Sequence, residues 1–453
     1  MKIHFIAIGG SAMHNIALAL KAKGHTITGS DDAIFEPSHS RLAAAEILPP
    51  QLGWYPDRIH ADLDAVIVGM HAKKDNPELD AAQKLGIKCY SYPEFLFEQS
   101  KAKTRVVIAG SHGKTTITAM VLHVLNYHDQ AVDYMVGAQL KGFDHMVHLT
   151  ETNDFILMEG DEYLSSPLDL TPKFLWYQPH VTLISGIAWD HINVFPTEAS
   201  YQDQFTLYLD TIVPGGTVVY NQEDAVLTRL VAATQNTIRK QPYTLPDHYI
   251  EDGVTYLPTD EGDLPLAVFG KHNLMNLAGA QWICQLIGID AIEFYEAIAS
   301  FSGADKRLEK MATGETAYLF KDFAHAPSKV QATSQAVTAQ FSTHRVIGCL
   351  ELHTYSSLTP AFLPQFKHTL AALEEAIVFY DPHALKIKGR TAIDPEAIRT
   401  AFDHPNMIVF DRPEDLHAYL LQKKYHQSVL LMMSSGNYGG LDWSALAQLI
   451  ERS

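Results

Sequence analysis

The sequence predicts an α/β protein of three domains with mainly parallel sheets. Strand-like apolar runs alternate with segments of helical spacing along almost the whole chain, a rhythm typical of parallel strands joined by helices. The chain has 453 residues and is therefore too long for a single hydrophobic core. Polar segments interrupt the alternation at 98–104 and near 301–310. We therefore expect domains at 1–102, 103–303 and 304–453.

Each predicted domain contains the same kind of alternation. The first domain reads as strand, helix and strand in KIHFIAI, SAMHNIALALKAKG and HTITGSD. In the second, the apolar strand RVVIAG precedes a segment of helical spacing, TTITAMVLHVL. The third restarts the pattern with the strands TAYLFKDF, HRVIGCLEL, AIVFYD, MIVFD and SVLLMMSSG.

Composition excludes several classes of function. The formal net charge of −18 argues against a general nucleic-acid or anionic-membrane binder, because both depend on surplus Lys and Arg. No apolar run approaches the length of a membrane span, so we expect a soluble protein. The three cysteines are far apart and form no CxxC pair, which favours reduced thiols in the cytoplasm (Cys89, Cys284, Cys349).

The segment IAGSHGKTTITAM, residues 108–120, resembles a phosphate-binding loop. The usual pattern is G-x-x-x-x-G-K-[ST], but its first glycine comes two residues late here, at Gly110. The loop lies between a predicted strand and a predicted helix, where backbone N–H groups and the helix dipole favour phosphate. Lys114 can reach the β- and γ-phosphates of ATP, and the Thr115 hydroxyl can bind Mg²⁺. A glycine-rich turn with a solvated lysine is the simpler alternative.

Acidic residues and a histidine follow two later strands of the same predicted domain. The run NDFILMEGDEY ends in Glu159, with Asp161 and Glu162 just beyond it, and VTLISGIAWDH ends in Asp190 and His191. Ligands bind at the carboxyl ends of parallel strands, so these side chains are candidate metal ligands. Each cluster alone would more often be a solvated loop or a structural histidine.

The N-terminal turn AIGGSAM resembles a dinucleotide fingerprint, G-x-G-x-x-G. Ala7 and Ala12 stand where the outer glycines would be, and Asp31 ends the next strand like a ribose-binding acid. NAD is the obvious ligand for this turn alone. A chain with a separate ATP loop suggests a different diphosphate.

Two further clusters are candidates for ligand binding. GKHNLMN, residues 270–276, opens a helix with His272, Asn273 and Asn276, and a simple helix cap is the alternative reading. KDFAHAP, residues 321–327, ends a strand of the third domain with Asp322 and His325, which favours a ligand-facing strand end.

The order of these motifs resembles the Mur ligases, the ATP-dependent amino-acid and peptide ligases of peptidoglycan synthesis. IGGSAM, GSD, GSHGKTT, EGDEY, DH, GKHNLMN, KRLE and DFAHAP follow one another as in that family, and together they cover the whole chain. The family's loop reads G-[ST]-x-G-K-T-[TS], so the late glycine is a signature of the family. The resemblance implies Rossmann-like N- and C-terminal domains around a central P-loop ATPase domain.

The resemblance also implies roles for individual residues. The UDP-sugar would bind at Gly9, Gly10, Ser11, Ala12 and Asp31. ATP would bind Gly110, Ser111, His112, Gly113, Lys114, Thr115, Thr116, Asn273, Asn276, Arg307 and Asp322. The catalytic residues would be Lys114, Glu159 and His191, with Mg²⁺ held by Thr115, Glu159 and His191. The amine substrate would contact His325, His353 and Asn437.

Within the family, the absence of one lysine limits the range of possible substrates. Several members use a carbamylated lysine after the DH motif, and this chain has no lysine between Lys173 and Lys240. That absence fits the ligases acting on UDP-N-acetylmuramate itself, which add either L-alanine or the recycled tripeptide L-alanyl-γ-D-glutamyl-meso-diaminopimelate.

EGDEY with the following loop (Tyr163, Ser165, Asp169), DFAHAPS and MSSGNYGG resemble the peptide-adding branch more closely. Two departures from that branch concern the amine site. Lys321 replaces a common Asp, and His353 stands where LEPRSNT of the peptide-adding branch has arginine. Arginine and lysine are the usual readers of carboxylates, and ALKIKGR offers Lys386, Lys388 and Arg390. The sequence therefore favours the tripeptide, with L-alanine as the alternative.

Two readings from other classes remain open. An NAD-dependent oxidoreductase built on the first turn would leave GKT, EGDE and GKHN unexplained. A nucleotide sensor without ligase activity is opposed by the intact Lys114, Thr115, Glu159 and His191. The sequence does not predict the oligomeric state.

Overall fold

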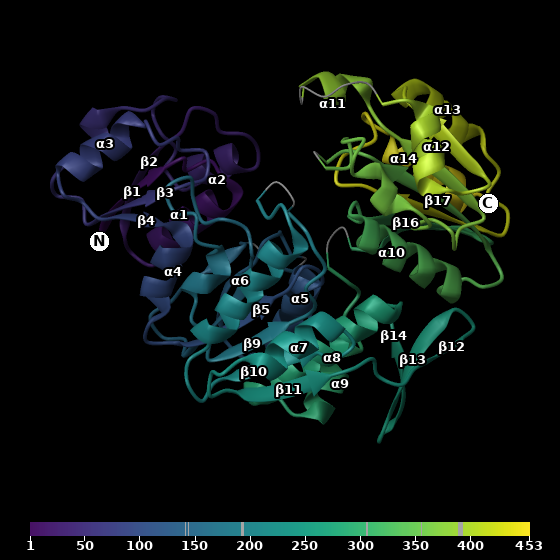
Figure 1. The fold of residues 1–453 in the computed structure, drawn as a ribbon, viewed down its shortest axis with the longest axis horizontal. Helices are drawn as coiled ribbons and strands as arrows, with labels where there is room; N and C mark the ends of the chain where they lie inside the picture. The colour runs from purple at the N-terminus through teal and green to yellow at the C-terminus, as the bar shows by residue number, and fades with distance from the viewer. Residues whose placement is uncertain (141, 144, 192–193, 305–306, 355, 388–392) are drawn as a thin grey trace. The chain divides into compact units, whose positions relative to one another are not determined.

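The structure is a computed structural model that describes the chain except for residues 141, 144, 192–193, 305–306, 355 and 388–392 (Figure 1). The chain forms two compact units. The first comprises Met1–Thr244 and Ala278–Phe294, and the second comprises Leu245–Leu277 and Tyr295–Ser453. Each unit has its own sheets and its own hydrophobic core.

The first sheet of the first unit is wholly parallel. Its strand order is β2-β1-β3-β4, with β1 at Lys2–Ile6, β2 at Thr26–Ser30, β3 at Ala65–Val68 and β4 at Cys89–Ser91. The connecting helices are α1 (Ser11–Ala22), α2 (Ser38–Ala44), α3 (Pro77–Lys84) and α4 (Tyr92–Ser100), with a 3-10 turn at Pro56–Arg58. β1 and β3 are almost completely buried, as expected for central strands covered by helices on both faces.

The second sheet of this unit has the order β11-β10-β9-β5-β8-β6-β7, parallel except for the β6–β7 pair. Its strands are β5 (Thr104–Ala109), β6 (Asp133–Met135), β7 (Val147–His148), β8 (Phe155–Gly160), β9 (Val181–Ile184), β10 (Thr217–Asn221) and β11 (Arg239–Tyr243). Its helices are α5 (Lys114–Tyr127), α6 (Glu198–Thr211) and α7 (Ala225–Ala233), with a 3-10 turn at Lys173–Trp176. β8 and β9 flank β5, so the segments after these strands meet the loop that follows β5.

The second unit contains a small antiparallel sheet and a larger, mainly parallel one. The small sheet is β12 (Tyr249–Glu251), β13 (Val254–Thr259) and β14 (Gly262–Leu266). The larger has the order β15-β16-β20-β17-β18-β19, with only β15 antiparallel. Its strands are β15 (Glu309–Thr313), β16 (Ala317–Asp322), β17 (Arg345–Glu351), β18 (Glu375–Phe379), β19 (Met407–Phe410) and β20 (Ser428–Met433).

The helices of the larger sheet are α10 (Pro327–Gln340), α11 (Pro382–Ile387), α12 (Pro395–Phe402), α13 (Pro413–Gln422) and α14 (Trp443–Glu451), with a 3-10 turn at Leu363–Phe366. Two helices, α8 (Lys271–Leu286) and α9 (Ala291–Ile298), contribute residues to both units. The predicted α/β class with mainly parallel sheets is confirmed.

The small sheet is fastened to α10 within the second unit. The Thr255 hydroxyl donates a hydrogen bond of 2.8 Å to the Gln340 side chain, and the Gln340 amide donates to the Gly253 carbonyl at 2.6 Å. Phe269 packs in the same core as Phe320. The residues 245–277 thus belong to the second unit, whereas we expected one domain over 103–303. The three predicted domain ranges stay predictions.

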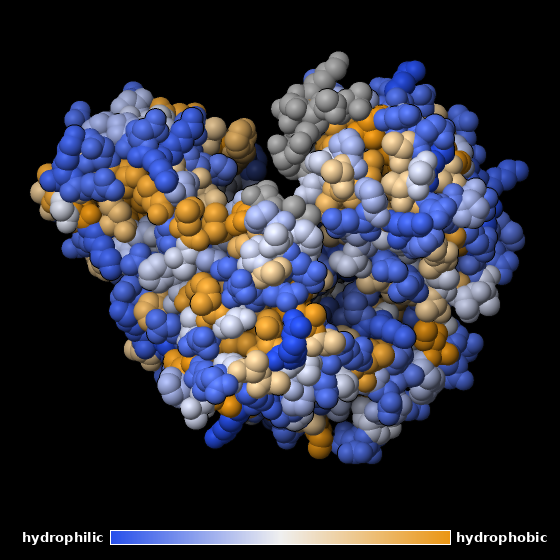
Figure 2. Space-filling model, in the orientation of Figure 1, coloured by the Kyte–Doolittle hydropathy of each residue, from blue (hydrophilic) through white to orange (hydrophobic). Residues whose placement is uncertain are grey.

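Hydrophilic residues cover most of the face shown in Figure 2, with hydrophobic ones interspersed among them, as expected for a chain with a net charge of −18. Among the described residues, no helix has both the length and the apolar character needed to cross a membrane.

Candidate active site

The loop after β5 explains the position of its first glycine. Gly110 has a φ of +115°, and a Cβ there would lie 2.3 Å from the Ser185 hydroxyl oxygen. Gly113 also has a positive φ, +80°, and α5 starts at the next residue. Only glycine adopts both conformations without strain. The loop therefore needs its glycine at 110 and not at 108, because Ile108 is still inside the buried strand β5.

The Lys114 ammonium group is held inside the loop. Its Nζ atom donates to the Gly110 carbonyl at 2.6 Å and to Oε2 of Glu162 at 2.7 Å. Burial lowers the pKa of Lys114, but the carboxylates of Glu162 and Asp161 outweigh this and raise it above its usual value. A permanent cation therefore stands at the start of α5, where phosphate would bind.

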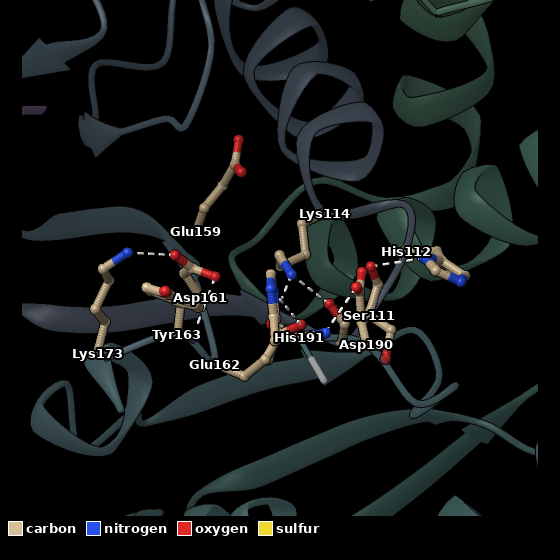
Figure 3. A network of polar contacts seen from close by, with 12 residues as sticks. Ser111, His112, Lys114, Glu159, Asp161, Glu162, Tyr163, Lys173, Asp190 and His191 are labelled. Atoms are coloured by element: carbon tan, nitrogen blue, oxygen red, sulfur yellow. Dashed lines mark hydrogen bonds and ion pairs between the residues drawn. The ribbon is translucent and has the colours of Figure 1, made fainter. Parts of the chain in front are cut away.

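Glu162 is the centre of this polar network (Figure 3). Its side chain is almost completely buried, and its Oε1 atom accepts from the Tyr201 hydroxyl at 2.9 Å and lies 3.4 Å from Nε2 of His191. Burial raises the pKa of Glu162, but Lys114 and His191 lower it well below its usual range. The same contact raises the pKa of His191, against the effect of burial. The Glu162 carboxylate is thus ionised and contacts both the Lys114 ammonium group and the His191 imidazole.

The predicted metal ligands fall into two neighbouring groups. The Thr115 hydroxyl donates to Oε2 of Glu159 at 3.2 Å, so these two predicted ligands are together. His191 lies with Asp161 and Glu162, whose ligand atoms are within 4.8 Å of its own, while the Glu159 carboxylate points away from them (Figure 3). Carboxylate and hydroxyl oxygens are the donors that Mg²⁺ takes in proteins, so the pair of Thr115 and Glu159 fits that ion.

The loop after the EGDEY motif is ordered by its own side chains. Lys173 Nζ forms an ion pair with Asp161, at 2.5 Å, and lies over the Tyr163 ring. Asp169 accepts from the Ser91 hydroxyl at 2.9 Å and from the Trp176 indole at 2.8 Å. Ser165 bonds the Thr171 carbonyl. These contacts fix the loop against β4 and the 3-10 turn at Lys173–Trp176.

Asp31 holds the N-terminal turn through a hydrogen bond from the backbone of the turn. Oδ2 of Asp31 accepts from the Gly9 N–H at 2.7 Å, and a Cβ at Gly9 would lie 2.9 Å from that oxygen. Gly10 precedes α1, in which Ser11 is the first residue and Ala12 the second. Asp31 is buried, and burial raises its pKa. In this structure Asp31 therefore shapes the turn, and its expected contact with a UDP-sugar stays a prediction.

The GKHN segment and the DFAHAP strand end both lie in the second unit. Asn273 donates to the Phe269 carbonyl at 2.9 Å, and both Asn273 and Asn276 are buried. Asp322, the last residue of β16, accepts from the N–H groups of Leu308 and Ala324, each at 2.6 Å. The Arg307 guanidinium lies 4.9 Å from the centre of the Phe323 ring. These contacts hold the candidate nucleotide-binding side chains; their role in ATP binding stays a prediction.

Three strand ends meet at one edge of the larger sheet of this unit. β16, β20 and β17 are neighbours, and they end at Asp322, Met433 and Glu351. His325 follows the first strand and donates to the Phe323 carbonyl at 2.7 Å, while Asn437 follows the second and is exposed. His353 follows the third. The three predicted amine-site residues thus come from adjacent strand ends.

A buried carboxylate joins two of these strand ends. Glu351 accepts from the Tyr438 N–H at 3.0 Å and from the Ser434 hydroxyl, and its Oε1 atom lies 3.7 Å from Nδ1 of His353. A Cβ at Gly436 would lie 2.7 Å from this carboxylate. Lys388 and Arg390 lie outside the described residues, as does the side chain of Lys386.

Sequence reasoning missed Tyr201 and Glu351, and it named Glu162 only as one candidate metal ligand among the acids of EGDEY. The bond from Lys114 to Glu162 was not predicted. Nothing in the sequence marks Tyr201 as part of a site, because a tyrosine on an amphipathic helix is usually interpreted as a residue of the hydrophobic core. Glu351 reads as the polar end of a strand.

Comparison with known proteins identifies the family. Residues 2–104 match the Mur ligase family, catalytic domain, and residues 108–284 match the Mur ligase middle domain. A UDP-N-acetylmuramate–L-alanine ligase from Caldicellulosiruptor bescii is 30% identical over 413 residues, which cover 88% of this chain and 87% of the relative. The chain belongs to the Mur ligase family. It is therefore an ATP-dependent ligase that forms amide bonds.

Solved structures of the family share the fold. A UDP-N-acetylmuramate–alanine ligase from Thermotoga maritima matches with a TM-score of 0.69 at 20% identity, covering 99% of this chain and 98% of its own. A murein peptide ligase from Psychrobacter arcticus matches with a TM-score of 0.65 at 21% identity, covering 100% and 99%. Membership of a ligase family excludes the oxidoreductase reading as an account of the whole chain, while the role of GSHGKTT as the ATP loop stays a prediction.

Proposed function

We propose that this Mur ligase joins UDP-N-acetylmuramate to L-alanyl-γ-D-glutamyl-meso-diaminopimelate, a reaction of peptidoglycan recycling. The observation that supports this choice is the meeting of DFAHAPS, LELH and MSSGNYGG at three adjacent strand ends. DFAHAPS and MSSGNYGG are motifs by which the sequence resembles the peptide-adding branch. His353, in LELH, departs from that branch, which has arginine there.

The reaction would proceed through an acyl phosphate. The muramate carboxylate attacks the γ-phosphorus of ATP, and the bond to the β–γ bridging oxygen breaks to release ADP. The peptide amine then attacks the acyl carbon, loses a proton, and the tetrahedral intermediate collapses to amide and phosphate. Lys114 offsets the charge on the transferring phosphoryl group, an electrostatic contribution that is usually the largest one in such reactions.

Mg²⁺ would be held by the Thr115 hydroxyl and the Glu159 carboxylate, with His191 as the third ligand that the family's pattern implies. When bound, the ion would neutralise phosphate charge. Glu162 would keep His191 in place through their contact at 3.4 Å.

The remaining roles follow the family's pattern. Gly9, Gly10, Ser11, Ala12 and the Asp31 that holds their turn would bind the UDP-sugar. Asn273 and Asn276 would serve the adenine, with Arg307 and Asp322 contacting ATP. His325, His353 and Asn437 would contact the incoming peptide.

L-Alanine is the second candidate for the amine substrate. The Caldicellulosiruptor bescii relative, at 30% identity, is an L-alanine ligase. His353 also replaces the arginine of the peptide-adding branch, and a histidine is a weaker, pH-dependent partner for a carboxylate.

A side-by-side kinetic comparison tests the proposal. ADP release is measured with ATP and UDP-N-acetylmuramate, and either the tripeptide or L-alanine as the amine. We expect the tripeptide to give the higher kcat/KM. A tenfold or greater preference for L-alanine, about 1.4 kcal/mol, would assign the protein to the alanine-adding branch. Calorimetry with UDP-N-acetylmuramate and with NAD, in which only the UDP-sugar binds, is the companion measurement.

A further inference from the structure

Tyr201 lies between two parts of the candidate ATP site, although it belongs to neither motif. It is on α6, in the first turns after the capping box at Thr197, and its side chain is fully buried. Its hydroxyl oxygen is 2.7 Å from the Ser111 hydroxyl, in the GSHGKTT loop, and 2.9 Å from Oε1 of Glu162. One phenol thus contacts both the loop and the carboxylate that holds Lys114.

The direction of these hydrogen bonds follows from the chemistry of the groups. An ionised carboxylate can only accept, so the single Tyr201 proton is donated to Glu162. The Tyr201 oxygen is then left to accept, and Ser111 donates to it. A chain of hydrogen bonds runs from Ser111 through Tyr201 to Glu162, and the other carboxylate oxygen of Glu162 binds Lys114 at 2.7 Å. The direction of every hydrogen bond in this series is therefore fixed.

We propose that Tyr201 is a positioning residue that sets the place of Lys114 through Glu162. Without its hydroxyl, Oε1 of Glu162 would keep the longer contact with His191, and the Ser111 hydroxyl in the loop would lose its bond to Tyr201. The carboxylate could then rotate, and the ammonium group would follow it. The γ-phosphate would meet a displaced Lys114. The inference depends on the family's ATP-dependent chemistry, and not on which amine is the substrate.

A purely structural role is the competing explanation, because buried tyrosine hydroxyls usually find a partner. The ring of Tyr201 packs edge-on against Phe195 and Phe205. The same helix supplies a matched control. Tyr208 is equally buried, stacks on Phe174, and bonds the Thr182 hydroxyl at 2.7 Å, away from the ATP loop. Tyr201→Phe and Tyr208→Phe therefore each remove one buried phenol hydroxyl from α6, and only the first of these hydroxyls contacts the candidate ATP site.

The two variants are compared by thermal unfolding, by ADP release and by nucleotide affinity. We expect similar losses of Tm, but at least a fivefold lower kcat only for Tyr201→Phe. Calorimetry should show a fivefold weaker affinity of Tyr201→Phe for a non-hydrolysable ATP analogue, with ADP affinity changed by less than twofold. A Tyr201→Phe protein with a kcat and an analogue affinity within twofold of the wild type would overturn the proposal. If the wild type itself releases no ADP with any amine, the proposed function fails, while the affinity comparison still tests Tyr201.

A double variant distinguishes action through Glu162 from a local disturbance. In a Glu162→Gln background, Tyr201→Phe should change the ratio of analogue affinity to ADP affinity by less than twofold, because the carboxylate that it orients is gone. The same fivefold effect in both backgrounds would show that Tyr201 acts independently of Glu162, and the proposal would be wrong.

Discussion

Glu162 and Glu351 are buried carboxylates at the ends of parallel strands, one in each unit, and they are satisfied in different ways. Glu162, just after β8, faces the ammonium group of Lys114 and the imidazole of His191. Glu351, at the end of β17, accepts from a hydroxyl and a backbone N–H in the loop after β20. The first is compensated mainly by charge and the second mainly by hydrogen bonds.

This difference indicates different tasks. The Lys114 ammonium group has three donors and gives one to Gly110 and one to Glu162, so it can bind a phosphate while Glu162 keeps it in place. The backbone N–H bonded to Glu351 has a single proton, and the N–H of Tyr438 would be left without a partner in the interior if the carboxylate moved. The surroundings of Glu162 are therefore those of a ligand-binding site. The surroundings of Glu351 are those of a carboxylate that holds a loop in place.

The largest effect is expected from Lys114→Ala. Loss of a charge that acts on the transferring phosphoryl group costs several kcal/mol, or roughly 10²-fold or more in rate. The protein should stay folded, because Glu162 keeps His191 and Tyr201 as partners. ADP release measures the rate and circular dichroism the fold. Near-wild-type turnover would remove Lys114 from the mechanism.

An intermediate effect is expected from Glu351→Ala. The variant leaves the Tyr438 N–H and the Ser434 hydroxyl without their acceptor, which costs about 1–3 kcal/mol of stability. The KM for the amine should rise because His353 and the loop with Asn437 lose their common support, while the KM for ATP stays within twofold. Glu351→Gln, which keeps one acceptor oxygen, should restore part of both losses.

Glu375→Gln is the control for that experiment. Glu375 is at the opposite end of the neighbouring strand β18 and pairs with Lys423 at 2.8 Å. The Glu375→Gln variant should change neither the KM for the amine nor the KM for ATP. A rise in the KM for ATP equal to that for the amine in Glu351→Ala would show a general loss of structure, and the division of tasks would not hold.

Much of the fold and of the site could be predicted from local patterns. Strand–loop–helix alternation gives the parallel sheets, and the spacing of Gly110, Gly113 and Lys114 gives the loop, because backbone geometry there depends on a few adjacent residues. The contact of Thr115 with Glu159 also follows, since β5 and β8 are neighbours, Glu159 is near the end of β8, and Thr115 is in the first turn of the helix after β5.

The remaining features depend on contacts between distant segments. Glu162 and not Glu159 contacts His191, and the two residues belong to different segments, one after β8 and one after β9. Tyr201 meets Ser111 across 90 positions of sequence. The attachment of β12–β14 to α10 likewise depends on one glutamine, Gln340, whose helix reads as an ordinary surface helix.

The smallest effect concerns a third buried carboxylate, Glu78 on α3, which lies in neither site. It accepts from the Tyr55 N–H at 2.7 Å and lies 3.3 Å from Nε2 of His4. Burial raises its pKa, but the bonds from His4, Ser30 and Tyr55 outweigh burial and lower it below 4.5. Glu78 thus has a histidine partner, as Glu162 has in His191, and a bond from a backbone N–H, as Glu351 has from Tyr438.

A carboxyl group with a lowered folded pKa stabilises the protein above its unfolded pKa, about 4.5, and this contribution is lost as the pH falls through the folded value. Glu78→Gln does not titrate, so it should be less stable than the wild type by about 1 kcal/mol at neutral pH. The difference in Tm should shrink steadily below pH 4.5.

Asp80→Asn, on the exposed face of the same helix, should show no such change. A Tm difference for Glu78→Gln that is constant from pH 7 to the acid limit would mean that Glu78 is held by hydrogen-bond geometry alone, like Glu351, and that its charge contributes nothing.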